Sequence, residues 1–137
     1  MQTRRWTNPS QPQTLHIAVI LMYLNAAFGL LLAALLNANS YTPFYELYRW
    51  VGADLALNIG RLSFLGMAVA AFGIANERKW GYKLGVALTS GEVILLFIAI
   101  GSLTNLGDHF VTALFTVARA ALLLHPMSRD YQRVWFK

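Results

Sequence analysis

The sequence contains no cysteine, and this absence excludes several classes of protein at once. Without thiols there is no disulfide framework, no Cys-ligated metal and no disulfide-exchange chemistry. Charge is also scarce, since only 12% of the residues are Asp, Glu, Lys or Arg while 57% are hydrophobic. A water-soluble domain of 137 residues needs more polar side chains than this to cover its surface. We therefore expect the bilayer to be the solvent of this chain.

Familiar catalytic patterns are missing as well. The sequence has no H-E-x-x-H, no phosphate-binding glycine loop, no G-x-S-x-G and no carboxylate-rich metal cluster. His16 and His125 are both expected at the cytoplasmic end of the molecule, where two histidines can ligate a b-type haem or contact interfacial water. A second histidine pair is lacking, which favours the interfacial interpretation. We expect a non-enzymatic protein without a cofactor or a metal.

Four segments are long and apolar enough to cross a bilayer: residues 15–36, 53–75, 82–103 and 109–125. The first exceeds the roughly 7–15 apolar residues of a signal peptide, so it is predicted to be a span and not a leader. Pro126 ends the fourth, because proline cannot continue the helical hydrogen bonds and biases His125 away from helix. The sequence thus predicts one all-α domain over residues 1–137, an integral membrane four-helix bundle.

The positions of Lys and Arg predict the orientation of these spans, because basic residues favour the cytoplasmic side. The basic residues of one side are Arg4, Arg5, Arg78, Lys79, Lys83, Arg129, Arg133 and Lys137. The opposite side carries Arg49. Both termini and the loop at residues 76–81 are therefore expected in the cytoplasm. The excess positive charge predicts contact with an anionic inner leaflet and not with nucleic acid, because no basic domain lies outside the spans.

Two segments outside the spans have amphipathic patterns. Tyr41, Phe44, Tyr45 and Tyr48 in the first outer loop follow the spacing i, i+3, i+4, i+7. This spacing favours a short helix lying in the outer interface over an aromatic-rich loop packed on the protein's own helices. The tail at residues 128–137 separates aromatic from basic residues in a similar way, and it is expected to lie on the inner leaflet.

Glu92 lies in the middle of the third apolar segment. A carboxylate at this depth is costly unless it is paired, hydrated or protonated. Glu92 is about 15 Å from the inner end of its span and Arg119 is about 9 Å from the same end. The short loop between the third and fourth spans makes them antiparallel neighbours. The sequence therefore predicts a Glu92–Arg119 ion pair.

Further polar residues occur inside the spans. Asp54, Asn58 and Arg61 share one helical face, from which Arg61 is expected to snorkel toward Asp54 and Asn58 or to reach inward to Glu92. The predicted interior polar network contains Asn25, Asn58, Arg61, Glu92 and Arg119, with Asp54 at the outer interface. The predicted close-packing face of the third span consists of Gly81, Gly85 and Thr89. That face can meet another helix of this chain or a second copy.

Two functions fit this pattern. In the first, a Glu92–Arg119 pair fixes helix packing in an accessory or scaffold subunit, or in a bundle that associates with itself. In the second, Glu92 carries protons or ions in a small transporter component, with Arg61 and Arg119 tuning it. Cations match or exceed anions in the spans, so a charged, paired Glu92 and the first function are favoured. The layout resembles many small four-span bacterial membrane proteins. That resemblance implies the bacterial inner membrane, with a homo-oligomer or a larger membrane complex as context.

Overall fold

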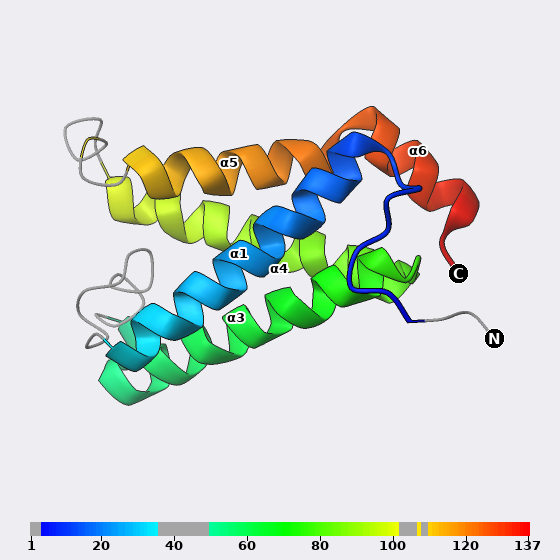
Figure 1. The fold of residues 1–137 in the computed structure, drawn as a ribbon. Coiled ribbons are helices and arrows are strands. Elements are labelled where there is room, and N and C mark those ends of the chain that lie inside the picture. The colour runs from blue at the N-terminus through cyan, green and yellow to red at the C-terminus, as the bar shows by residue number, and fades with distance from the viewer. Residues whose placement is uncertain (1–3, 36–49, 102–106, 108–109) are drawn as a thin grey trace.

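A computed structural model of the chain describes residues 4–35, 50–101, 107 and 110–137, and within them the chain is all-α (Figure 1). The helices are α1 (Gln13–Leu35), α3 (Ala53–Ala75), α4 (Lys79–Ile100), α5 (Phe110–Leu124) and α6 (Pro126–Trp135). Helices α1 and α4 each pack against both α3 and α5. The first described residues and the C-terminus lie at the same end of the molecule, here called the termini end, and α6 lies across it (Figure 1). The amphipathic helix predicted around residues 41–48 falls outside the described residues.

Three helices, α1, α3 and α4, are long and apolar enough to cross a membrane. Helix α5 has 15 residues and therefore spans only about 22 Å, less than the roughly 30 Å of a hydrocarbon core. It reaches the required length only when α6 is counted with it, across a bend of 49°. Among the described residues the structure thus contains three candidate spans, or four if α5 and α6 form one broken span.

The surface of these helices is apolar where a soluble protein would be polar. The outward residues of α1 are Ile17, Ile20, Leu24, Phe28 and Leu31, which recur at helical spacing. Many buried positions instead carry alanine, including Ala18, Ala26, Ala56, Ala70, Ala71 and Ala75. Small residues between helices and large apolar residues outside are typical of helices packed in lipid.

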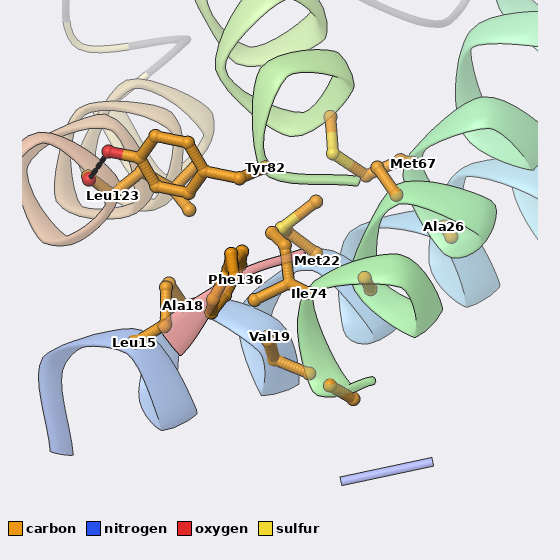
Figure 2. Close-up of a cluster of buried hydrophobic side chains, with 13 residues drawn as sticks. Leu15, Ala18, Val19, Met22, Ala26, Met67, Ile74, Tyr82, Leu123 and Phe136 are labelled. Atoms are coloured by element: carbon orange, nitrogen blue, oxygen red, sulfur yellow. Dashed lines mark hydrogen bonds between the residues drawn. The ribbon is translucent and has the colours of Figure 1, made fainter. Parts of the chain in front are cut away.

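A buried apolar cluster joins α1, α3 and the C-terminus near the termini end (Figure 2). Its core includes Leu15, Val19, Met22 and Ile74, all of them at most 1% exposed. Phe136, the residue after α6, lies among them. Phe136 therefore anchors the C-terminal segment in the core, while Val134, Trp135 and Lys137 around it are exposed.

Two phenols in or against this cluster, Tyr82 and Tyr23, differ in their hydrogen bonding. Tyr82 on α4 donates a hydrogen bond of 2.6 Å to the carbonyl of Leu123, which ties α4 to α5 (Figure 2). The hydroxyl of Tyr23 on α1 is buried without a hydrogen-bond partner. One phenol thus links two helices, and the other serves as an apolar ring.

The predicted close-packing face of α4 contacts other helices of the same chain. A Cβ placed on Gly81 would lie 2.6 Å from the Gly73 Cα of α3, so the two backbones touch where the helices cross. A Cβ on Gly85 would lie 2.9 Å from the Met22 Cε of α1. Thr89, one turn further, is buried. Gly81 and Gly85 therefore meet helices of the same chain, which decides between the two partners that the sequence left open.

The turn between α3 and α4 ends α3 with a hydrogen-bond pattern usually completed by glycine. The Arg78 N–H donates to the Gly73 carbonyl at 2.9 Å and the Glu77 N–H donates to the Ile74 carbonyl at 3.0 Å. Glu77 itself has a φ of 56°, the left-handed conformation. A non-glycine residue there costs about 1–2 kcal/mol. The side-chain hydrogen bonds of Glu77 offset this cost.

Glu77 makes these hydrogen bonds with distant parts of the chain. Its carboxylate accepts hydrogen bonds from the Asn8 amide at 3.2 Å and from the Tyr131 hydroxyl at 2.8 Å. Its backbone carbonyl accepts from the Lys137 N–H at 2.9 Å. Glu77 thus connects the N-terminal segment, the α3–α4 turn and α6. Glu77 is not among the residues predicted from the sequence, because its partners are far away in the chain.

Tyr131→Phe is expected to destabilise the chain by about 1–2 kcal/mol, because the Glu77 carboxylate loses a hydrogen-bond donor. The matched control is Tyr23→Phe, which removes a hydroxyl that has no partner and is expected to be neutral or slightly stabilising. Thermal unfolding of the two variants in detergent measures the difference. Equal melting temperatures for the two variants would show that the Glu77–Tyr131 bond adds nothing.

The Tyr131–Glu77 hydrogen bond makes the stability of the folded chain fall at alkaline pH. Burial raises the pKa of the Tyr131 phenol, the hydrogen bond and charge of Glu77 raise it further, and Ser10 lowers it. A raised pKa in the folded state means that the stabilisation is complete below about pH 10 and is lost as the pH rises further. Tyr131→Phe is expected to reduce this alkaline loss in a pH series of unfolding curves.

Candidate functional site: a buried charged centre

Glu92 on α4, Arg119 on α5 and Asn25 on α1 meet between the helices. The Arg119 guanidinium donates to the Glu92 Oε2 and forms an ion pair with it. The Asn25 amide donates to the other oxygen, Glu92 Oε1, at 3.2 Å. The Glu92–Arg119 pair is therefore present as the depth argument predicts, and Asn25 joins it from a third helix.

The direction of the helices explains how residues of different depth meet. Side chains on an α-helix tilt toward its N-terminus. Helix α4 begins at the termini end, so the Glu92 side chain tilts back toward that end. Helix α5 ends there, so the Arg119 side chain tilts away from it. The long Arg119 side chain and the Glu92 carboxylate therefore approach each other from opposite directions.

The ion pair is almost completely shielded from solvent. The side chains of Arg119 and Glu92 are 3% and 8% exposed. Desolvation of two charges offsets much of their attraction, so such a pair contributes little net stability while both partners are present. Removing one partner is different, because the other is left as an uncompensated buried charge. The pair therefore acts mainly by requiring α4 and α5 to hold one register.

A cavity of about 310 Å³ opens beside this centre, between α1 and α5. Its polar part consists of Asn25, Thr112, Thr116 and Arg119, and its apolar walls include Leu24, Phe28 and Phe115. The Nε of Arg119 is buried without a hydrogen-bond partner. Sequence analysis did not include Thr112 and Thr116 in the site. The signal was available, since Thr112, Thr116 and Arg119 follow i, i+4, i+7 and all three line the cavity.

Three of the predicted network residues lie elsewhere. Asp54, Asn58 and Arg61 are exposed on the outer face of α3 and do not join Glu92. The prediction that Asn58 and Arg61 face the interior is wrong, because α3 turns a different face inward. Phe64 and Met67 occupy that inward face, together with Ala56, Ala71 and Ile74. In the described part of the chain, the structure gives no hydrogen bond or ion pair for the Arg61 side chain.

The two predicted interfacial histidines have separate environments. His125 is exposed at the start of α6, where its Nδ1 accepts a hydrogen bond of 3.2 Å from the Met127 N–H. His16 is in the first turns of α1, and its Nδ1 is buried without a partner. Within the described residues there is no group of three or more His, Cys, Asp or Glu side chains that could hold a metal ion.

The chain matches no protein-family model, and the comparisons with curated proteins and with solved structures found no match. A functional interpretation must therefore be built from the geometry of two polar features. One is the buried centre of Asn25, Glu92 and Arg119. The other is the exposed row of Asp54, Asn58 and Arg61, here called the α3 stripe.

Proposed function

We propose that this chain is a small non-enzymatic integral membrane protein that acts by association. It serves as an accessory or scaffold subunit of a membrane complex, or as a bundle that associates with copies of itself. It crosses the bacterial inner membrane as a four-helix bundle with both termini in the cytoplasm. Support for this orientation comes from the basic residues, which gather at the termini end.

The α3 stripe is the observation that carries the proposal. Arg61 lies about 12 Å along α3 from Ala53, which is deep enough to enter the hydrocarbon. An arginine facing lipid near the middle of a span costs about 2.5–3.5 kcal/mol on insertion scales. Covering the α3 stripe with another helix replaces lipid by hydrogen-bonding partners and removes part of this cost. An exposed polar row on an otherwise apolar surface therefore favours a protein partner.

A second copy of this chain has suitable chemistry for that partner. The stripe contains one acid, one amide and one base, so its charges cancel. Helix α3 begins at the end opposite the termini, and the Arg61 side chain therefore tilts toward the depth of Asn58 and Asp54. In a two-fold dimer of parallel copies, Arg61 of each copy approaches Asn58 and Asp54 of the other. A single self-complementary contact then covers the polar groups of both copies.

Arg61→Leu is expected to weaken the association by about tenfold or more, because the variant face is stable in lipid without a partner. The measurement is the mass of the tagged chain purified in a mild detergent, with mass spectrometry of all co-purifying proteins. Arg78→Leu is the matched control, since it removes an arginine that is also exposed but lies outside the stripe. Wild-type protein that runs as a single 15.3 kDa chain and carries no partner contradicts the proposal.

Exchanging the charges of the stripe distinguishes self-association from binding to a different subunit. Asp54→Arg alone places two cations on each face and is expected to disrupt self-association. The double variant Asp54→Arg/Arg61→Asp restores a balanced face and is expected to recover it. If the stripe instead binds a different subunit, the double variant fails to recover binding, because only one of the two surfaces has been exchanged.

The alternative function is a small proton- or ion-coupled transporter component that uses Glu92. The cavity between α1 and α5 favours it, because this cavity reaches Asn25 and Arg119, which both contact the Glu92 carboxylate. In this case Glu92→Gln folds normally and abolishes a pH-dependent flux in liposomes. An unchanged flux, or a chain without flux in the wild type, removes this alternative.

A further inference from the structure

A second cavity lies at the termini end, between α4 and α6, and it has a different chemistry. Its volume is about 520 Å³. Lys83 from α4 and Arg129, Gln132 and Arg133 from α6 contribute its polar groups. Residues of two helices far apart in sequence therefore bring three cations and one amide to a single cavity.

These cations are not neutralised by the protein. Lys83, Arg129 and Arg133 are exposed, and among the residues described here the structure gives none of them an ion pair. Neither of the acidic side chains of this end, Glu77 and Asp130, lines the cavity. Glu77 is engaged by Asn8 and Tyr131 instead. A concave surface with three unpaired cations favours an anionic ligand.

The other walls of the cavity are apolar. Val86 and Ala87 lie on α4 about one turn beyond Lys83, away from the termini end, and Leu124 ends α5. The Lys83 side chain tilts toward the N-terminus of α4, which is the termini end, so its ammonium and the α6 arginines share one level. The cavity thus has a cationic part at the membrane surface and an apolar part that continues into the span.

We propose that this cavity is a binding site for one anionic phospholipid. The phosphate ester contacts Lys83, Arg129 and Arg133, Gln132 bonds to a headgroup oxygen, and an acyl chain lies along Val86 and Leu124. Basic pockets between helices at the membrane surface suit such headgroups. The apolar wall distinguishes this ligand from a free phosphate, which has no tail to place there. The site does not involve the α3 stripe and stands whether or not the chain associates.

Position and shape separate this site from diffuse attraction to an anionic surface. Arg4, Arg78 and Lys79 lie at the same end, and they are also exposed, yet they do not line the cavity. They contribute to the general field of the termini end. Lys83, Arg129 and Arg133, by contrast, surround a space with an apolar continuation. A comparison of the two sets with equal charge removed therefore isolates the site.

The test uses the full chain in nanodiscs that contain phosphatidylcholine and phosphatidylglycerol, with lipid retention measured by native mass spectrometry after transfer to detergent. The cavity variant is Lys83→Gln/Arg129→Gln/Arg133→Gln, and the control variant is Arg4→Gln/Arg78→Gln/Lys79→Gln. We expect the cavity variant to retain about tenfold less phosphatidylglycerol than the control variant. The wild type is expected to retain it in preference to phosphatidylcholine.

Equal losses in the two triple variants overturn the proposal in favour of diffuse electrostatics. A second arm adds glycerol 3-phosphate or inorganic phosphate at millimolar concentration. Displacement of the lipid by either anion at concentrations where phosphatidylcholine has no effect shows a free-phosphate site and overturns the lipid assignment. If the triple variant does not fold, Arg129→Gln and Arg133→Gln are compared singly with Arg78→Gln. Each is expected to retain less phosphatidylglycerol than Arg78→Gln, by a smaller factor than the triple variant.

Discussion

Glu92→Leu is expected to destabilise the folded chain by about 3–5 kcal/mol. The substitution leaves the Arg119 guanidinium almost fully buried with no anion beside it. Arginine does not lose its proton in proteins, so the variant must keep a bare cation or open the contact between α4 and α5. The Asn25 amide also loses the oxygen to which it donates at 3.2 Å. Both consequences act in the same direction.

Arg119→Leu is expected to cost less than Glu92→Leu. The carboxyl group of Glu92 can take up a proton and become neutral, which arginine cannot do. The Asn25 amide still has an oxygen to donate to. This asymmetry follows from the chemistry of the two groups and does not depend on the exact strength of the pair. It therefore tests whether both side chains are buried as the structure shows.

The double variant Glu92→Leu/Arg119→Leu is expected to be more stable than Glu92→Leu alone. With both charges removed, no buried charge is left unpaired, and only the neutral Asn25 amide lacks its former partner. The free energies of unfolding of the four proteins in mixed micelles form a double-mutant cycle. The control is Thr89→Val on the same helix as Glu92. It removes a buried hydroxyl that has no hydrogen-bond partner, and it is expected to be nearly neutral. Purely additive losses would show that Glu92 and Arg119 do not interact.

The buried pair and the α3 stripe show what the sequence can predict about a membrane helix. The depth of a residue follows from counting along a span, and the short loop makes α4 and α5 neighbours. Glu92 and Arg119 could be matched on these two facts alone. The rotation of a helix about its axis does not follow from counting. The sequence analysis therefore placed Arg61 at a reasonable depth but on the wrong face.

The rotation of α3 is set by packing that involves small residues. A Cβ on Gly29 of α1 would overlap the ring of Phe64, which shows that this ring lies directly on the α1 backbone. Further along α3, Gly73 touches the backbone at Gly81. These two contacts place one face of α3 inward and leave Asn58 and Arg61 outside. Glycine spacing in the first and second spans was the available signal, but it identifies neither partner by itself.

The contacts of Glu77 could not be predicted for a different reason. Its partners, Asn8, Tyr131 and Lys137, come from the two ends of the chain and meet only after the helices have packed. The amphipathic pattern of the tail did indicate a helix, and α6 is present there. The pattern assigned Tyr131, Val134 and Trp135 to the face that lies on the inner leaflet, and Val134 and Trp135 are exposed in the structure. The pattern did not predict that Phe136, just beyond α6, packs into the protein core.

Gly81→Leu is expected to destabilise the chain by about 3 kcal/mol or more, and Gly81→Ala by about 1–2 kcal/mol. The first atom of either side chain would lie 2.6 Å from backbone atoms of Gly73, which cannot rotate away as a side chain can. The two helices would have to separate at this crossing. The turn that follows α3 is short, so the separation would also strain the bonds that hold Glu77.

Gly91→Ala is the matched control, because it is a glycine of the same helix with no atom within 4 Å of an added Cβ. Alanine favours helix over glycine by about 1 kcal/mol, so this variant is expected to be neutral or more stable. The same preference acts at Gly81, and any net loss there must therefore come from the crossing with Gly73. Unfolding in detergent that gives Gly81→Ala the stability of Gly91→Ala would mean that α3 and α4 do not touch at this point. A loss confined to Gly81→Ala and Gly73→Ala instead identifies the crossing as the contact that positions α4, and with it Glu92, for the ion pair with Arg119.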